Sequence, residues 1–211
     1  MTQDEDAARL GLRERKKRET RVALSQATIR LCVQRGWDDV TVEDIAAAAN
    51  VSVRTFRNYF SGKAEAIAAS HLERMRRVAD ELRARPADEP LWESVAHAVE
   101  GQFAPKGGPE QGSSEDRRRW TDGVRLMLAE PALHGEIVKA NAAAQEELAR
   151  AVAERTGTDV ARDVYPKLVA AVVGAGSAVA VEHSLTADPP VSLAAVLRET
   201  FDGIVAGLPA P

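Results

Sequence analysis

Residues 40–60, VTVEDIAAAANVSVRTFRNYF, decide the fold, because they contain two short helical patterns separated by a tight turn. At the start of the first pattern, the Thr41 hydroxyl can cap a helix, and Asp44 three residues later completes a capping box. Asn50 follows the first pattern and tolerates the left-handed backbone conformation that a tight turn needs. The spacing therefore predicts a helix-turn-helix.

The second of these helices, predicted over 53–60 with Ser52 as its cap, has two different faces. Val53, Phe56 and Phe60 recur at helical spacing and form an apolar face. The opposite face presents Arg54, Arg57 and Asn58, with Thr55 and Tyr59 at its flanks. Arginine pairs with guanine edges and asparagine with adenine edges, so such a helix can enter the major groove of double-stranded DNA. The alternative is an arginine-rich face that is only solvated.

Charge is distributed unevenly along the chain. The net charge is −4, yet 12 basic and only 6 acidic residues lie between Arg9 and Lys63. A basic segment of this kind suits contact with phosphates, and Thr41 and Lys63 are placed for such contacts. The basic run could follow the DNA backbone or the minor groove, or could equally be a solvated tail; its residues are Arg15, Lys16, Lys17 and Arg18.

The rest of the chain continues the helical pattern. Aromatic residues make up only 4% of the sequence, which favours packed helices over sheets. With no competing strand pattern, we predict an all-α fold of about nine helices. The further helices are predicted over 13–35, 63–85, 91–103, 116–129, 132–156, 160–185 and 192–208, with a linker at 86–90 and a flexible loop at 104–114.

The sequence argues against several classes of protein. Its N-terminus is charged throughout, unlike a signal peptide, and its longest uncharged apolar run, 168–181, is too short to span a bilayer. Cys32 is the only cysteine and is predicted to be a buried small hydrophobe. The four histidines are too scattered for a metal site, and no nucleophile–base pair or phosphate-binding glycine loop is present. We expect a cytoplasmic protein that is not an enzyme, binds no metal or cofactor and contacts no membrane.

One set of residues matches a known family. The set comprises Ala27-x-x-x-Leu31, Gly36-Trp37, Thr41-Val-x-Asp44-Ile45-Ala46, Val51-Ser52, Thr55-Phe56, Tyr59-Phe60 and Lys63. Through it, the run from Thr20 to Ile67 resembles the DNA-binding domain of the TetR family of transcriptional regulators. The resemblance implies that the DNA-facing residues are Thr41, Ser52, Arg54, Thr55, Tyr59 and Lys63. Arg57 departs from the family, which usually has an aromatic residue there that meets the DNA backbone; Arg57 could do so by charge or could read a base.

The C-terminal part resembles the acyl-CoA-like ligand-binding class of these regulators, through Arg119-Trp120 and the run Leu128-Ala129-Glu130-Pro131-Ala132-Leu133. This resemblance implies a ligand pocket among the middle helices. Its candidate lining residues are Trp92, Phe103, Trp120, Met127 and Tyr165, although a helical body needs such residues simply as core. Arg125 could pair with a ligand carboxylate or phosphate, or form a surface salt bridge.

The last two predicted helices have more apolar surface than one small body needs. Small residues permit close helix approach in the first of them, and a wide apolar stripe follows in the second. We predict that both helices pair with their copies across a two-fold axis as a four-helix bundle, although the same faces could cover the pocket. The predicted interface residues are Ala171, Gly174, Ala178, His183, Leu197, Phe201 and Ile204.

These inferences divide the chain into a flexible N-terminus (1–12), a helix-turn-helix domain (13–62) and a ligand-binding and dimerisation domain (63–211). The resemblance implies a homodimeric regulator that binds a palindromic operator in double-stranded DNA. Repression relieved by a small-molecule effector is the family default, and activation is the alternative.

Overall fold

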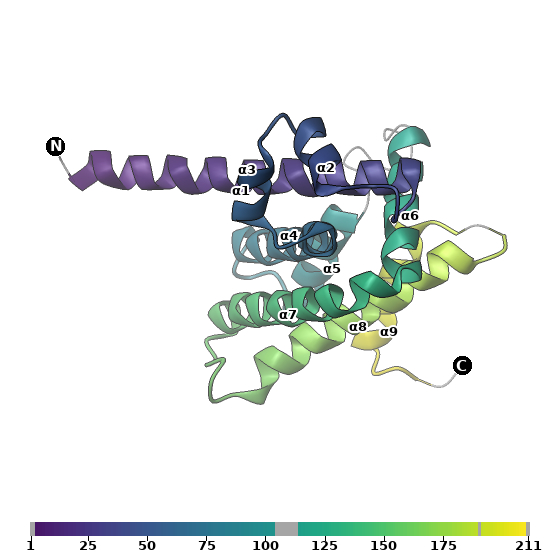
Figure 1. Ribbon diagram of the computed structural model, residues 1–211. Helices are drawn as coiled ribbons and strands as arrows, with labels where there is room; N and C mark the ends of the chain where they lie inside the picture. Colours follow the sequence, from purple (N-terminus) through teal and green to yellow (C-terminus); the bar gives the residue numbers. More distant parts are fainter. Residues whose placement is uncertain (1–2, 104–113, 190, 210–211) are drawn as a thin grey trace. The chain divides into compact units, whose positions relative to one another are not determined.

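The computed structural model describes residues 3–103, 114–189 and 191–209, and across them it contains nine α-helices, one 3-10 helix and no strand (Figure 1). The predicted all-α fold is confirmed. The chain forms two compact units: Met1–His71 with Asp122–Val138, and Leu72–Thr121 with Lys139–Pro211. Three helices contribute to both units, namely α4 (Lys63–Ala84), α6 (Ser114–Ala129) and α7 (His134–Thr156).

The first unit is built on α1 (Gln3–Arg35), with α2 (Val42–Ala48) and α3 (Val53–Tyr59) beside it in Figure 1. A short 3-10 helix, η1 (Pro131–Leu133), belongs to the same unit. The core of this unit is apolar, and its large side chains that are at most 1% exposed are Leu24, Ile45, Phe56, Phe60, Ile67 and Leu133. Burial of this cluster fixes the orientation of α3.

Helix α1 differs from its predicted start. It begins at Gln3, ten residues before the predicted start near Arg13. Residues 3–10 contain no proline or glycine and are rich in good helix formers, so nothing in them ends the helix. The predicted C-terminal end is confirmed, because Gly36 follows α1 with a φ of +95° that favours glycine.

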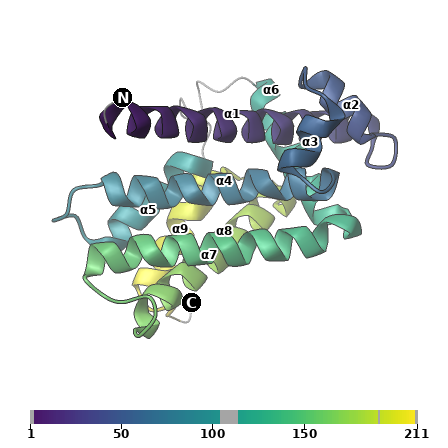
Figure 2. The same ribbon diagram turned by 60° about the vertical axis from the view of Figure 1, so that its left-hand side comes forward.

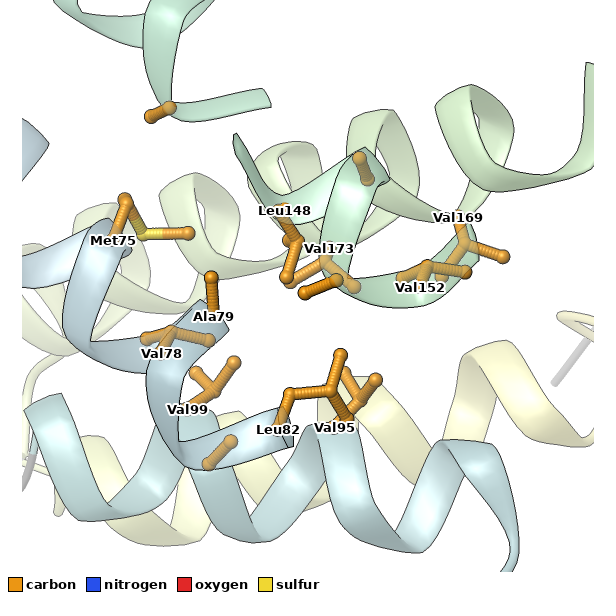
Figure 3. Packing of buried hydrophobic residues seen from close by; sticks show 14 of the residues in the cluster. Met75, Val78, Ala79, Leu82, Val95, Val99, Leu148, Val152, Val169 and Val173 are labelled. Atoms are coloured by element: carbon orange, nitrogen blue, oxygen red, sulfur yellow. The ribbon is translucent and has the colours of Figure 1, made fainter. Parts of the chain in front are cut away.

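The second unit packs α5 (Leu91–Phe103), α8 (Val164–Thr186) and α9 (Leu193–Val205) with parts of α4, α6 and α7. Figure 3 shows valine, leucine and methionine side chains from α4, α5, α7 and α8 pointing toward one another. Helices α8 and α9 lie side by side (Figure 2). A loop was predicted at 104–114. Residues 104–113 lie outside the described residues, and the last residue of the predicted loop, Ser114, is the first residue of α6.

Helix α8 begins at Val164, four residues after the predicted start at Val160. The backbone N–H of Ala161 donates to Asp159 Oδ1 at 2.7 Å, and that of Asp159 donates to Asp163 Oδ2 at 2.7 Å. These local bonds stabilise a turn in place of the first helical turn.

By length and composition, α8 is the one helix among the described residues that could cross a membrane. The uncharged run at 168–181 is by itself too short to span a bilayer. Helix α8 is longer, because it continues beyond that run at both ends. Within the second unit, α8 packs its inner face against the core, where Val169 and Val173 are buried.

Candidate functional site

The start of α2 carries the predicted capping box, which is confirmed. The Thr41 hydroxyl accepts a hydrogen bond from the backbone N–H of Asp44 at 3.2 Å, and Asp44 Oδ2 accepts one from the backbone N–H of Thr41 at 3.0 Å. Hydrogen bonds from Thr41 lower the pKa of the Asp44 carboxyl. The reciprocal bonds fix the entry of α2.

The turn between α2 and α3 also follows the prediction. Asn50 has a φ of +53°, in the left-handed region. The hydroxyl of Ser52 accepts a hydrogen bond from the backbone N–H of Thr55 at 3.0 Å and lies 2.8 Å from the Thr55 hydroxyl. The Ser52 side chain therefore caps α3 directly after the turn.

The inner face of α3 is anchored by Phe56 and by Phe60, the residue that follows the helix; they are 0% and 1% exposed, and their rings are tilted by 51° with centroids 5.7 Å apart. Arg21 of α1 secures the end of the helix, donating from Nη1 to the Tyr59 carbonyl at 3.0 Å. Its guanidinium lies 4.4 Å from the Phe60 ring centroid, and Glu65 Oε1 lies 3.6 Å from its Nη2. Sequence reasoning missed Arg21, because its partners lie about 40 residues away.

The outer face of α3 is polar and open. Arg54, Arg57 and Asn58 are exposed, and none of them has a hydrogen-bond or ion-pair partner in the part of the chain that the structure describes. Thr55 and Tyr59 are half-buried at the edges of this face. The structure therefore brings together the three predicted base-reading side chains, with their donors and acceptors free for base edges.

The remaining predicted DNA-binding residues differ in their surroundings. Lys16 and Lys17 are exposed on α1. The Lys63 ammonium is already engaged within the first unit, where it donates to the carbonyls of Trp37 and of Val40, the latter at 3.0 Å. It also lies 4.2 Å from the Trp37 ring centroid. These contacts connect the start of α4 to the segment between α1 and α2.

The six predicted pocket residues do not form one cluster. Phe103, Trp92 and Trp120 contribute to the second unit and pack on its core. Met127 packs on the core of the first unit instead, and the Arg125 side chain is 62% exposed, with Nη1 3.9 Å from Asp122 Oδ1. Tyr165 is 46% exposed on α8. The residue types alone, aromatic, methionine or arginine, do not indicate to which of the two units each residue belongs.

The predicted interface residues are also divided. Leu197 and Phe201 are buried in the core of the second unit, Ile204 packs partly buried on that core, and Gly174 is half-buried. Ala171, Ala178 and His183 are exposed on α8. They share that helix with three large exposed side chains, namely Val164, Leu168 and Val179.

Cys32 is 2% exposed in the core of the first unit, so its predicted role as a buried small hydrophobe is confirmed. Burial raises the pKa of its thiol. Across the residues that the structure describes, no three histidine, cysteine, aspartate or glutamate side chains are grouped to hold a metal ion.

Comparison with known proteins identifies the family. Residues 24–69 match the bacterial regulatory proteins of the tetR family, and residues 89–209 match the MftR C-terminal domain. The chain belongs to the TetR family of bacterial transcriptional regulators. It is therefore a DNA-binding helix-turn-helix regulator and not an enzyme, as the resemblance implied.

Individual relatives cover most of the chain. It is 32% identical to the transcriptional regulator TcmR of Streptomyces glaucescens, over 90% of this chain and 84% of TcmR. It is 30% identical to MftR of Mycobacterium tuberculosis, a regulator named for mycofactocin biosynthesis, over 88% of this chain and 89% of MftR. Among solved structures, FadR of Thermus thermophilus matches with a TM-score of 0.55 at 18% identity, covering 90% of this chain and 96% of FadR.

Proposed function

We propose that the chain is a repressor that binds a palindromic operator as a homodimer and leaves it when a small-molecule effector binds. The observation that supports this most directly is the outer face of α3. It offers two arginines and one asparagine, exposed and without partners among the described residues, on a helix whose inner face is buried.

In this proposal, Arg54, Arg57 and Asn58 read base edges in the major groove. The phosphate contacts come from residues around them: Lys16, Lys17, Thr41, Ser52, Thr55 and Tyr59. Lys63 supports the interface mainly from within, because its ammonium holds the Trp37 and Val40 carbonyls. Arg57 is given the base-reading role because its guanidinium is exposed beside Asn58.

A palindromic operator has two-fold symmetry, so the proposal requires a two-fold symmetric dimer. Two copies of α3 must lie about one turn of DNA apart, roughly 34–36 Å, to read two half-sites. The exposed apolar side chains of α8 are the surface that we assign to the partner copy, with α9 beside it. The four-helix arrangement would bury these side chains on both subunits.

The effector is proposed to bind in the second unit and to act through α4. This helix contributes residues up to His71 to the first unit and the following residues to the second. A ligand changes operator affinity only if it binds one conformation of the dimer more tightly than the other. An acyl-CoA-like effector is supported by the C-terminal resemblance and by the structure of FadR, which was solved with lauroyl-CoA. The proposed location is the cytoplasm, where such effectors and bacterial DNA meet.

The test is equilibrium binding by fluorescence anisotropy, at physiological salt, to duplexes tiled across the DNA upstream of the protein's own gene. We expect a palindromic tile to bind at least ~10³-fold more tightly than its scrambled counterpart. Arg54→Ala should weaken binding to that tile by about 1–3 kcal/mol and relax the base preference.

Arg162→Ala is the matched control, because Arg162 is an exposed arginine of the second unit, outside the helix-turn-helix. It should leave operator affinity unchanged. Equal loss of affinity for operator and scrambled DNA in Arg54→Ala would contradict base reading by this helix. It would point to phosphate contact alone.

A further inference from the structure

Arg74 of α4 is a half-buried cation in an aromatic environment. Its guanidinium carbon lies 5.2 Å from the ring centroid of Phe103 and 6.0 Å from that of Trp120. All three residues belong to the second unit, where Phe103 and Trp120 pack on the apolar core. Stacking on rings satisfies the faces of a guanidinium but leaves its five N–H donors in need of acceptors.

Arg74 lacks those acceptors in the part of the chain that the structure describes. No carboxylate lies within ion-pair distance of it, and no hydrogen bond involves its guanidinium. Burial lowers the pKa of Arg74 to about 10, and the like charge of Arg77 contributes further. Arg83 and Arg150 of the second unit, in contrast, are each paired with glutamates, and Arg76 and Arg77 of the same helix are exposed to solvent.

A second donor without a partner lies on one of the two aromatic rings. The indole nitrogen Nε1 of Trp120 is buried and has no hydrogen-bond partner among the described residues. Buried indole N–H groups normally find an acceptor, because leaving one unpaired costs the full penalty of its desolvation. Two donor groups beside one apolar cluster thus lack a protein acceptor, and an anion carrying two or more oxygens could supply acceptors for both.

We propose that Arg74 and the Trp120 indole N–H form the polar end of a ligand site that binds the carboxylate or phosphate of an organic anion with an apolar body. This inference rests on the proposed effector function and specifies its chemistry. The guanidinium fork pairs with two oxygens of the anion, and the indole N–H donates to one of them. The apolar body extends along Phe103 and Met75, which are 7% and 4% exposed.

Arg74 was not among the residues selected from the sequence, which pointed to Arg125 as the anion partner. The structure distinguishes the two arginines by their environments. Arg125 is exposed and near Asp122, so its charge is screened by water and by a carboxylate. Arg74 is half-buried against two aromatic rings and has no carboxylate beside it among the described residues, so a bound anion is screened less there than at Arg125.

The experiment measures binding of four ligands to the full-length protein by isothermal titration calorimetry, without DNA and below micelle-forming concentrations. The anions are laurate, dodecyl phosphate and lauroyl-CoA, which differ in the group that carries the charge. Dodecanol is the uncharged ligand with the same chain. We expect at least one anion to bind the wild-type protein about tenfold or more tightly than dodecanol. Which anion binds best identifies the head group.

Three variants then locate the site. Arg74→Gln should weaken anion binding by about tenfold to hundredfold and leave dodecanol binding unchanged, because only the charge-assisted bonds are lost. Trp120→Phe keeps the ring, removes the N–H donor and should weaken anion binding by about three- to tenfold. Arg76→Gln is the matched control on the same helix, since Arg76 is exposed, and it should bind all four ligands as the wild type does. If Arg74→Gln does not fold, Arg74→Lys replaces it, and its anion affinity should be intermediate.

Equal binding of dodecanol and the anions to the wild type would overturn the proposal, as would failure of all three anions to bind. An unchanged anion preference in Arg74→Gln would do the same. The operator assay keeps this outcome separate from the proposed function, because Arg74→Gln should bind operator normally without ligand. Operator binding without anion binding would refute only the site. Anion binding without a specific operator would refute only the DNA-binding proposal.

Discussion

At the scale of single residues, polar side chains hold the connections between helices in place, and Glu89 is a clear example. This carboxylate, between α4 and α5, accepts hydrogen bonds from the Arg85 guanidinium and the Ser94 hydroxyl. One of its oxygens also lies 3.1 Å from His97 Nδ1. The bonds from Arg85, and next those from Ser94, lower the pKa of Glu89 to about 2.

This lowered pKa predicts a defined pH dependence. Because the pKa of Glu89 is lower in the folded state, its contribution to stability is complete above the unfolded value near 4.5. It is lost as pH falls from there toward 2. We expect thermal unfolding temperatures to decrease across this window, and Glu89→Gln to flatten part of that decrease.

The control for this prediction is Glu93→Gln, which removes an exposed carboxylate from the first turn of the neighbouring helix α5. The unfolding temperature of Glu93→Gln should decrease with falling pH as steeply as that of the wild type. If Glu89→Gln loses stability equally at pH 3 and pH 7, the hydrogen-bonded ionised form of Glu89 is not the source of the pH dependence.

Residues whose partners are close in sequence were predictable, and residues with distant partners were not. Thr41, Asn50 and Ser52 act within three residues of their own positions, so their types and spacing were sufficient. Arg21 and Arg155, in contrast, donate to carbonyls far along the chain, in the case of Arg155 to those of Leu82 and Arg85. A sequence pattern specifies neither of these pairings, nor the aromatic neighbours of Arg74.

At the scale of elements, the contact between α8 and α9 depends on a glycine. A Cβ atom on Gly176 would lie 3.0 Å from Ile204 Cδ1 and 3.2 Å from Thr200 Cγ2. A larger side chain must therefore move α9 or distort its own rotamer. We predict that Gly176→Val lowers the free energy of unfolding by about 1–3 kcal/mol, measured by urea denaturation.

Gly101 in α5 provides the comparison for the same substitution, because nothing lies within 4 Å of its Cβ position. Gly101→Val should change stability by only a few tenths of a kcal/mol, since valine is a slightly better helix former than glycine. Similar losses in both variants would mean that valine itself, and not the approach of α9, is responsible.

For the two C-terminal helices, the sequence predicted the helices but not which of their faces are buried. Their existence and approximate bounds followed from helical periodicity. Periodicity did not show which face of each helix packs on the core, because α8 is apolar around much of its circumference. Thus Leu197 and Phe201 of α9, assigned to a partner, are core, while Leu168 of α8 is 56% exposed. Only the positions of the neighbouring helices distinguish an inner from an outer leucine.

At the scale of the whole molecule, the exposed apolar residues of α8 connect the fold to the proposed dimer. Val164, Leu168 and Val179 are 75%, 56% and 61% exposed, and the smaller Ala171 and Ala178 are exposed on the same helix. Large apolar side chains gathered on one helix commonly mark an interface in a soluble protein. A stable interface buries about 800 Å² on each partner, so two helices per subunit are a plausible minimum.

Placing a charge on this surface should separate the subunits. Leu168→Glu would bury a carboxylate against its own symmetry mate, so we expect a shift from dimer to monomer at micromolar concentration, measured by sedimentation equilibrium. The unfolding temperature of the wild type should rise with protein concentration, and that of Leu168→Glu should not. Val138→Glu introduces the same charge at a residue of α7 that is 67% exposed, and it should remain dimeric. A wild-type chain that is monomeric at these concentrations would contradict the assignment of α8 to the interface. An operator bound by such a monomer would be expected to contain one half-site and no palindrome, since a two-fold DNA sequence is read by a two-fold protein.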